Sequence, residues 1–348
     1  MNTPLKVGIA GYGVVGKRRR QVIDERDDLK VVAVCDQSFA NDGVIDDGIQ
    51  CFSNYRNLLK EDLDVLLVCM SNDIAAEVTI AGLENNLHVF CEKPPGRDVS
   101  DIENVIACAS SRPHLKLKYG FNHRYHLSVR EALKIVGSGE LGRVINLRGV
   151  YGKSQLITFD QDSWRTRRDL AGGGVLLDQG IHIVDLIRLF SGEFTQVHSF
   201  ISNDHWGHDV EDNAYALMRT AEGTVAMLHS SATQWRHSFR LEITLAKGAI
   251  VLSGILSGSK SYGAETLTVI RTGDDDRGDP REVTTRYNQD PSWSEEVAEF
   301  AHAIFEDEEI TNGSADEALK TMQLVYRIYC ADPDWKSRWN LNDDVSSV

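Results

Sequence analysis

Short apolar runs alternate with longer amphipathic stretches through the first third of the chain. The apolar runs are of strand length, and the stretches between them have the periodicity of helices. Strands are predicted at residues 5–10, 29–35, 65–69, 88–91 and 115–119, and helices at 17–25, 73–86 and 100–111. Regular strand–helix alternation predicts an α/β domain with a doubly wound parallel sheet.

Consecutive strand-like runs replace this alternation after residue 119. They predict strands at 144–150, 196–202, 214–220, 224–230, 239–245, 249–252 and 267–270. Tight turns between several of them predict a mainly antiparallel sheet, and the apolar helix predicted at 174–190 would cover one face of it. Further helices are predicted at 127–136, 294–306 and 315–329, and the acidic segment 273–280 is predicted as a solvated hairpin tip.

Length and composition narrow the class of protein. The 348 residues suit two domains, here 1–121 and 122–335, with a polar tail at 336–348; the chain is expected to fray from residue 331. A net charge of −15 argues against a nucleic-acid partner, which needs lysine and arginine to neutralise phosphates. No apolar run approaches the roughly 18–20 residues of a membrane span, and no signal peptide is recognised. Six cysteines without a Cys-x-x-Cys pair suit a reducing compartment, so we expect a cytoplasmic protein without a membrane partner.

A glycine-rich turn joins the first strand to the first helix. Its sequence is Gly11-Tyr-Gly13-Val14-Val15-Gly16, and the second predicted strand ends at Asp36, 20 residues beyond Gly16. Such a strand–turn–helix unit binds the pyrophosphate of a dinucleotide at the helix N-terminus, and the later acid binds the adenosine ribose. An acid here repels a 2′-phosphate and favours NAD. NADP stays as the alternative, because the basic run at residues 18–20 could accept that phosphate.

Two polar segments follow later strands of the same predicted sheet. Ser71-Asn72 follows the strand at 65–69, and Glu92-Lys93-Pro94-Pro95 follows the strand at 88–91. Ligands of doubly wound sheets bind outside the carboxyl ends of the strands. We therefore expect Lys93 near the nicotinamide, where an ammonium group can stabilise a developing alkoxide; the alternative is an ordinary surface lysine.

The apolar helix that follows Gly172-Gly-Gly174 carries the candidate acid–base pair. Asp178 and His182 lie four residues apart, which places them on one helix face, and Asp185 continues the stripe. A carboxylate next to an imidazole can orient the ring for proton transfer near neutral pH. The alternative is a satisfied polar pair on a partly buried face.

These motifs occur together, in one order, in a known family. The glycine turn, Glu92-Lys93-Pro94, Gly120-Phe-Asn-His-Arg-Tyr125, Trp164-Arg165 and the stretch 172–185 make the chain resemble the Gfo/Idh/MocA family of NAD(P)-dependent oxidoreductases over roughly residues 4–330. The resemblance implies an α/β Rossmann domain plus an α+β C-terminal domain whose mainly antiparallel sheet is open on one face. It also implies a sugar, sugar-derivative or polyol substrate, and assembly into a homodimer or homotetramer through that sheet.

The resemblance also assigns roles. Lys93 corresponds to the family's catalytic lysine, His182 to its general acid/base, and Asp178 to the partner of the base that also binds substrate. Cofactor contacts are expected from the residues Gly11, Gly13, Val14, Val15, Gly16, Asp36, Ser71, Asn72, Glu92, Lys93, Trp164 and Arg165, and substrate contacts from Lys93, Asn122, Arg124, Arg165, Asp178 and His182. The family often has a histidine after the fourth strand, in Thr-Pro-x-x-x-His, and residues 70–75 lack it here.

Substrate and reaction are less narrowly defined. Arg165, Arg167 and Arg168 suggest an anionic group, such as a uronate or a nucleotide sugar, in preference to a neutral polyol; the alternative is a basic loop without such a role. Two other functions remain open: a dinucleotide-binding sensor without turnover, and a glycosidase that oxidises its substrate transiently with NAD. His205, His208 and the neighbouring Asp209 could ligate zinc, but no further ligands accompany them and no metal is expected.

Overall fold

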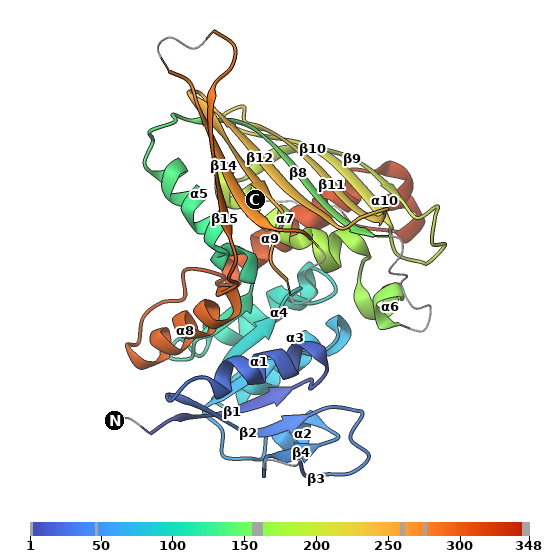
Figure 1. Ribbon diagram of the computed structural model, residues 1–348. Helices are drawn as coiled ribbons and strands as arrows, with labels where there is room; N and C mark the ends of the chain where they lie inside the picture. The colour runs from blue at the N-terminus through green and yellow to red at the C-terminus, as the bar shows by residue number, and fades with distance from the viewer. Residues whose placement is uncertain (1–2, 46–47, 155–162, 258–261, 274–276, 343–348) are drawn as a thin grey trace. The chain divides into compact units, whose positions relative to one another are not determined.

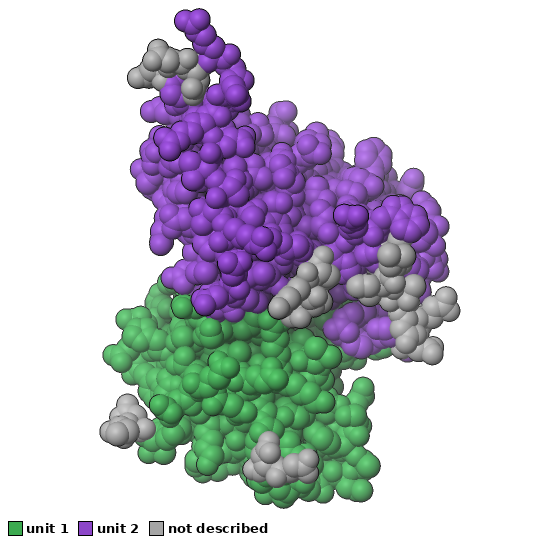
Figure 2. Space-filling view, in the orientation of Figure 1, with its two compact units in different colours: residues 1–121, 169–172, 293–320 green, residues 122–168, 173–292, 321–348 purple. Residues whose placement is uncertain are grey.

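The computed structural model describes residues 3–45, 48–154, 163–257, 262–273 and 277–342. The chain forms two compact units (Figure 2): unit 1 contains residues 1–121, 169–172 and 293–320, and unit 2 contains residues 122–168, 173–292 and 321–348. The expected boundary after residue 121 coincides with a boundary between the units. Residues 293–320, expected in the second domain, belong to unit 1 instead, because their helix packs on the parallel sheet.

Unit 1 is built on a seven-stranded sheet in the order β3-β4-β2-β1-β5-β6-β7 (Figure 1). Only the short pair β3–β4 is antiparallel. The strands are β1 (Leu5–Ala10), β2 (Leu29–Cys35), β3 (Gly43–Val44), β4 (Gln50–Phe52), β5 (Val65–Val68), β6 (His88–Glu92) and β7 (Leu117–Gly120). The helices are α1 (Val14–Asp24), α2 (Tyr55–Leu58), α3 (Asn72–Glu84), α4 (Val99–Ser110) and α8 (Ser292–Phe305). The predicted Rossmann sheet is confirmed; β3, β4 and α2 are too short for the sequence pattern to have indicated them.

The core of unit 1 explains why α8 belongs to it. Apolar residues of β1, β2 and β5 pack with Ile23 of α1, with Phe90 of β6, and with Val297, Phe300 and Ala301 of α8. The rings of Phe90 and Phe300 meet edge to face, with centroids 5.6 Å apart. A helix distant in sequence thus completes the hydrophobic cover of the sheet, which local periodicity does not predict.

Unit 2 is built on an eight-stranded sheet in the order β15-β14-β13-β12-β8-β11-β10-β9. Its strands are β8 (Val144–Ser154), β9 (Phe194–Ser202), β10 (Asn213–Thr220), β11 (Val225–Gln234), β12 (Ser238–Leu245), β13 (Gly248–Ser253), β14 (Glu265–Arg271) and β15 (Arg281–Tyr287). Only β8 and β11 pair in parallel, so the expected mainly antiparallel sheet is confirmed. The sequence pattern did not predict β15, whose side chains are almost all exposed; residues 274–276 of the predicted acidic hairpin tip lie outside the described residues.

The helical segments of unit 2 are η1 (Asn122–Tyr125), α5 (Leu127–Gly137), η2 (Trp164–Thr166), the π-helical turn η3 (Leu176–Gly180), α7 (Ile181–Ser191), α9 (Ala315–Cys330) and α10 (Pro333–Trp339); the short α6 (Arg168–Ala171) and the start of α9 cross the division between the units. Helices α7 and α9 lie along one face of the eight-stranded sheet (Figure 1). In β10, Ala214, Ala216 and Met218 face the covered side, and Tyr215 and Leu217 face outward.

The C-terminal segment is folded over part of the stretch that was expected to fray. Residues 333–339 form α10, which begins with an N-cap: the carboxylate of Asp332 accepts a hydrogen bond from the Trp335 amide at 2.9 Å. Trp335 is only 3% exposed. The expectation of a frayed chain from residue 331 is therefore wrong up to residue 339, because tryptophan burial outweighs the polar character of the segment.

One helical stretch in the described chain, Arg168–Ser191, is long and apolar enough to cross a membrane by length and composition alone. No apolar segment of that length was expected from the sequence, and this expectation is corrected. The stretch is long because α6, η3 and α7 follow one another with only residues 172–175 between α6 and η3. In the structure, 78% of its most apolar 18 residues are buried, and the core helix of a folded protein can be equally long and apolar.

Candidate active site

The glycine turn of unit 1 leaves the start of α1 open to a ligand. Gly11 has a φ of +92°, and a Cβ there would lie 2.3 Å from the carbonyl oxygen of Cys69, so only glycine fits. A Cβ on Gly13 would meet no protein atom within 4 Å. Gly13 is the N-cap of α1 and no side chain caps the helix, so its first amide groups face open space, as pyrophosphate binding requires. The residues fit a dinucleotide.

Asp36 lies beside this turn at the end of β2. Its carboxylate accepts hydrogen bonds from the amide of Tyr12 at 2.8 Å and from the amide of Ser38 at 2.9 Å. Partial burial opposes its ionisation, but these hydrogen bonds outweigh burial and lower the pKa of Asp36. An ionised acid is thereby held where the fingerprint requires a partner for ribose hydroxyls.

Residues 169–172 are far along the chain but contact α3 and the segment after β6 within unit 1. The side chain of Asn72, which is buried at the start of α3, donates a hydrogen bond to the carbonyl oxygen of Ala171 at 2.7 Å. Gly172 has a φ of +79°, and a Cβ there would lie 2.1 Å from the carbonyl oxygen of Arg97. Ser71 is the N-cap residue of α3. Asn72, predicted to contact cofactor, therefore also holds the segment that leads to the helix of His182.

Glu92, which precedes Lys93, belongs to a buried charge network. Arg19 of α1 donates to the carboxylate of Glu92 at 2.6 Å and to that of Glu296 in α8 at 2.7 Å. Its guanidinium lies 4.4 Å from the ring centroid of Phe90 and 4.2 Å from that of Trp293. The network connects the dinucleotide-binding helix with the segment of Lys93, whose peptide bond to Pro94 is cis.

Glu296 is fully buried in this network. Burial raises the pKa of its carboxyl to about 7; the guanidinium of Arg19 opposes the shift and the charge of Glu92 adds to it. The folded network therefore favours the protonated form of this carboxyl.

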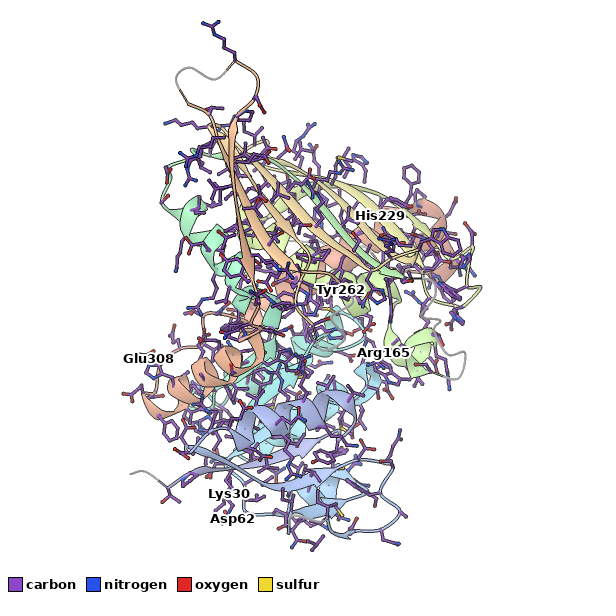
Figure 3. The ribbon with its side chains drawn as sticks, in the orientation of Figure 1. Lys30, Asp62, Arg165, His229, Tyr262 and Glu308 are labelled. Atoms are coloured by element: carbon purple, nitrogen blue, oxygen red, sulfur yellow. The ribbon has the colours of Figure 1, made fainter. Side chains whose placement is uncertain are left out.

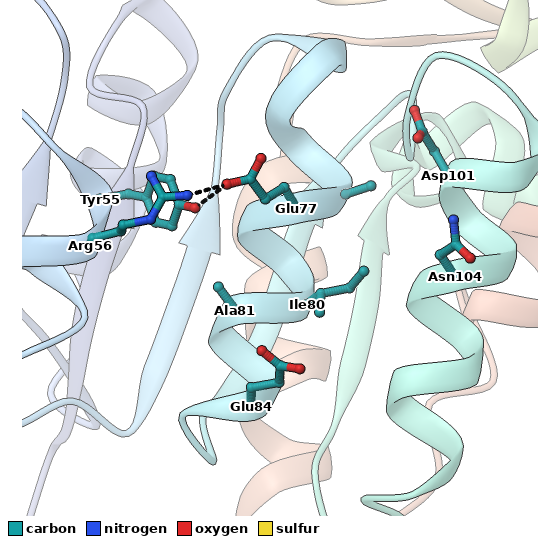
Figure 4. A pocket seen from close by; sticks show the side chains of 9 residues that line it. Tyr55, Arg56, Glu77, Ile80, Ala81, Glu84, Asp101 and Asn104 are labelled. Atoms are coloured by element: carbon teal, nitrogen blue, oxygen red, sulfur yellow. Dashed lines mark hydrogen bonds and ion pairs between the residues drawn. The ribbon is translucent and has the colours of Figure 1, made fainter.

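A surface groove of about 480 Å³ lies elsewhere on unit 1, among α2, α3 and α4 (Figure 4). Glu77 accepts hydrogen bonds there from Tyr55 and from Arg56, as the dashed lines show. None of its nine lining residues was predicted to bind cofactor or substrate.

A buried acid of unit 2 anchors the start of the helix that carries His182. Glu211 accepts hydrogen bonds from the amides of Gly174 at 2.7 Å and Leu176 at 2.8 Å, and from the hydroxyl of Tyr329 at 2.7 Å. Burial raises the pKa of Glu211 despite these donors. The carboxyl satisfies amides that would otherwise be orphaned at a helix start.

Asp178 lies in the π-helical turn η3, and α7 begins three residues later. The sequence pattern predicted one continuous α-helix, whereas the structure has this wider turn first. The Asp178 carboxylate is partly exposed and lies 3.7 Å from Nε of Arg165, whose guanidinium lies 4.4 Å from the ring centroid of Trp164. Figure 3 labels Arg165. The predicted residues Asp178, Arg165 and Trp164 thus form one cluster.

His182 is 6% exposed in the first turn of α7. Its ring stacks on that of His123, with centroids 3.7 Å apart and planes 12° apart. A buried imidazole in such a contact has a restricted orientation, which suits directed proton transfer.

Asn122 and Arg124, predicted to bind substrate, are buried beside the same helix. Arg124 donates to both carboxylate oxygens of Asp185, at 2.7 and 2.5 Å, and Thr321 donates to the same carboxylate at 3.0 Å. Asp185 was expected to continue the stripe of Asp178 and His182. Its carboxylate is instead occupied by the buried bidentate pair with Arg124. Substrate contact by Asn122 or Arg124 stays a prediction.

Arg168 lies with its guanidinium against aromatic side chains of α10. Its guanidinium lies 4.7 Å from the ring centroid of Trp339 and 5.8 Å from that of Trp335, and its amide donates to Asp209 at 2.9 Å. These contacts connect α10 with the loop that carries Arg165. Asp209 thereby has a structural partner, and the described residues contain no group of three or more His, Cys, Asp or Glu side chains that could hold a metal ion.

Sequence reasoning did not predict the roles of three residues here: Glu211, His123 and Arg19, which was considered only as part of a basic run that could accept a 2′-phosphate. Each acts through a partner at least 35 positions away in the chain, as between Leu176 and Glu211. The one available signal was the position of His123 between two motif residues, Asn122 and Arg124.

Comparisons with known proteins agree with both units. Residues 5–121 match the oxidoreductase family with an NAD-binding Rossmann fold, and residues 129–251 match the GFO/IDH/MocA C-terminal domain. The D-glucoside 3-dehydrogenase of Escherichia coli (strain K12) is 32% identical over 260 residues, which are 66% of this chain and 71% of that protein. The levoglucosan dehydrogenase of Pseudarthrobacter phenanthrenivorans is 26% identical over 228 residues, which are 58% of each chain.

A solved structure of levoglucosan dehydrogenase in complex with NADH has the same fold. Its TM-score is 0.79 at 22% identity, over 95% of this chain and 98% of that one. The fold, the glycine turn with Asp36, and the two matches together show that unit 1 contains an NAD-binding Rossmann domain and that the chain belongs to the Gfo/Idh/MocA family of oxidoreductases.

Proposed function

We propose that the protein transfers hydride between NAD and a secondary alcohol of a sugar or polyol. The bound cofactor supplies the hydride acceptor, its nicotinamide ring. In the oxidative direction the substrate C–H bond breaks and its electron pair leaves with the hydride, the hydroxyl proton passes to His182, and a ketone forms. Ketone reduction uses the same groups in reverse.

The roles of the side chains follow from their chemistry. His182 is the general base, and proton transfer by a positioned base contributes roughly 10²–10⁴-fold to the rate. Lys93 stabilises the developing alkoxide with its ammonium group. Asp178 binds the substrate and helps to orient the base. The observation that carries the proposal is the burial and fixed stacking of His182 on a helix anchored by Glu211, in a chain with an NAD-binding domain.

The contacts of the basic run beside the glycine turn favour NAD over NADP. The guanidinium of Arg18 lies 4.2 Å from the ring centroid of Trp293. Arg20 donates to Asp24 at 3.1 Å and to the hydroxyl of Tyr12 at 2.8 Å. These arginines are engaged within unit 1, and the nearby ionised Asp36 repels a 2′-phosphate.

We further propose a neutral sugar or polyol as substrate. Two of the three arginines that suggested an anionic group have partners within unit 2: Arg168 lies among aromatic rings, and Arg165 lies beside Asp178. The argument for a uronate or nucleotide sugar is weaker for that reason. Relatives named for glucosides, levoglucosan and inositol support the neutral class.

The test is reduced-nicotinamide absorbance with NAD and NADP, across glucosides, anhydrosugars, inositols, uronates and nucleotide sugars. We expect turnover with NAD and a neutral substrate, a loss of at least 100-fold in kcat for His182→Ala, and little change in the Kd for NADH. Unchanged turnover of His182→Ala would refute the role of the base. Tight NADH binding without turnover on any substrate would identify a sensor, and glycoside cleavage without net NADH formation would identify the glycosidase.

Self-association through the open face of the unit 2 sheet is proposed from its exposed apolar side chains. Leu217 of β10 is 49% exposed and pairs across strands with Met227 of β11, which is 53% exposed. Tyr215 pairs with Phe200 of β9, which is 78% exposed, and stacks on His229 of β11 with ring centroids 4.1 Å apart. Figure 3 labels His229 on this sheet. A contiguous apolar patch of this kind marks a protein interface.

Analytical ultracentrifugation tests this assembly. The double variant Leu217→Lys/Met227→Lys places two charges in the patch and is expected to convert a dimer or tetramer into smaller species. Val44→Lys adds a charge at an exposed apolar position of unit 1 and should leave the sedimentation coefficient unchanged. A monomeric wild type, or an unchanged assembly of the double variant, would refute the proposed interface.

A further inference from the structure

His123 lies against the flat face of His182 and is enclosed by other rings. Besides the 3.7 Å stack, its centroid lies 5.9 Å from that of Phe239 and 5.4 Å from that of His126, both edge to face. His123 is 7% exposed and comes from η1, whereas His182 comes from α7. The two imidazoles therefore form one buried layer contributed by separate elements.

Asn122 defines which nitrogen of His123 carries a proton. The Asn122 amide nitrogen donates to the hydroxyl of Ser292 at 3.0 Å, and that hydroxyl donates to Asp290 at 2.6 Å. Because the hydroxyl proton of Ser292 is committed to a carboxylate, the hydroxyl can only accept from Asn122. The amide oxygen of Asn122 consequently faces Nδ1 of His123 at 3.2 Å, and Nδ1 must donate the proton.

The other ring nitrogen has a donor of its own. Nε2 of His123 lies 3.2 Å from the hydroxyl of Tyr151. Burial raises the pKa of Tyr151 well above its ordinary value, so the phenol keeps its proton. Tyr151 is hydrogen-bonded in turn to Tyr262, labelled in Figure 3, which accepts from the amide of Gln179 at 2.8 Å. Because Nδ1 carries the proton of the neutral ring, Nε2 is an acceptor and the Tyr151 hydroxyl donates to it.

We infer that His123 is a positioning residue for His182: an uncharged ring, locked as the Nδ1–H tautomer, that fixes the plane of the base and stabilises the imidazolium formed on proton transfer. This inference rests on the proposed function of His182. The neutral state matters because a second charge under the base would oppose its protonation, whereas a neutral π face attracts a cation. The hydrogen bonds of Asn122 to Nδ1 and of Tyr151 to Nε2 keep the ring in that state.

The first experiment determines the tautomer and the charge of the His123 ring, and it needs no substrate. Protein labelled with ¹⁵N in histidine is recorded by long-range ¹H–¹⁵N NMR between pH 6 and 8.5, and His123→Phe identifies the signals. We expect His123 to stay neutral with its proton on Nδ1 across this range. A protonated ring, or the Nε2–H tautomer, would overturn the inference. Tyr151→Phe removes the hydroxyl donor to Nε2 and should allow that nitrogen to take up a second proton within this range, with Nδ1 still protonated.

The second experiment measures kinetics on the substrate found in the panel. His123→Ala is expected to lower kcat roughly 3- to 30-fold, the effect of a cation–π contact of this class, with the Kd for NADH unchanged. His123→Phe keeps a flat ring and should recover most of the loss. The solvent isotope effect on kcat should rise in His123→Ala, since proton transfer becomes more rate-limiting; a smaller amount of folded enzyme would leave that effect unchanged.

His302→Ala, which removes an exposed histidine of unit 1, is the matched control and should leave kcat unchanged. Equal kcat and isotope effect in wild type and His123→Ala would overturn this inference while leaving the proposed function intact. No turnover by wild type, with the expected tautomer observed, would instead be a failure of the proposed function alone.

Discussion

The buried carboxyl of Glu296 predicts a pH-dependent loss of stability that one substitution should remove. In the folded chain its pKa is about 7, against an ordinary value of 4.5. The folded state therefore binds this proton more tightly than the unfolded state, and the free energy of unfolding falls as the pH rises from 4.5 to about 7. At about 1.4 kcal/mol per pH unit, this carboxyl removes about 3 kcal/mol by pH 8.

Glu296→Gln tests this reasoning, because the amide oxygen can still accept from Arg19 but has no proton to lose. Urea unfolding followed by tryptophan fluorescence at pH 5, 6, 7 and 8 gives the free energy for wild type and variant. We expect the difference to move in favour of the variant by about 2.5 kcal/mol between pH 5 and 8. Glu295→Gln, the same change at an exposed neighbour on α8, is the control.

Parallel curves for wild type and Glu296→Gln would refute the reasoning. Such a result would mean that Glu296 is ionised throughout and acts only as an ion-pair partner of Arg19. A control that moved as far as Glu296→Gln would show that helix charge, and not the buried network, causes the effect.

Three further predictions concern separate parts of the chain. Asp36→Ser removes the repulsion of a 2′-phosphate and should weaken NAD binding about 10-fold while improving NADP, as measured by fluorescence titration with each cofactor. Asp185→Asn breaks the buried pair with Arg124 and should lower the free energy of unfolding by about 3–5 kcal/mol; a thermal midpoint equal to wild type would contradict it. Trp339→Ala removes the nearest ring over Arg168 and should cost about 1 kcal/mol by cation–π loss; Arg168→Met should cost less in the Trp339→Ala background than in wild type, as a double-mutant cycle measures.

The spacing of residues along the chain was sufficient to predict much of unit 1. The strand–glycine–helix order places Gly11, Gly13 and Gly16 in one turn, and Asp36 follows at the end of the next strand, which pairs directly with β1. These features depend on neighbours in sequence or in adjacent parallel strands, where the pattern of apolar and polar residues is most informative. The two sheets, and the place of His182 on a buried helix, were predicted on the same basis.

Packing between distant segments was not predictable in this way. Trp335 follows a polar stretch, and its burial and its contact with the distant Arg168, which explain why α10 is folded, leave no signal in the local sequence. Glu296 lies 277 positions from Arg19, and no local signal marks it as a buried acid. The same holds for β15, whose exposed strand lacks the alternation that identifies a half-buried one.

The sequence by itself determined the two kinds of sheet, the dinucleotide turn and the candidate residues Lys93, Asp178 and His182, because each depends on residue type and short-range spacing. Only the tertiary structure decided how those residues are held. It stacked His182 on His123, anchored the helix start with Glu211, and paired Asp185 with Arg124. A buried polar group is stable only with a partner of matching geometry, and folding draws that partner from any part of the chain.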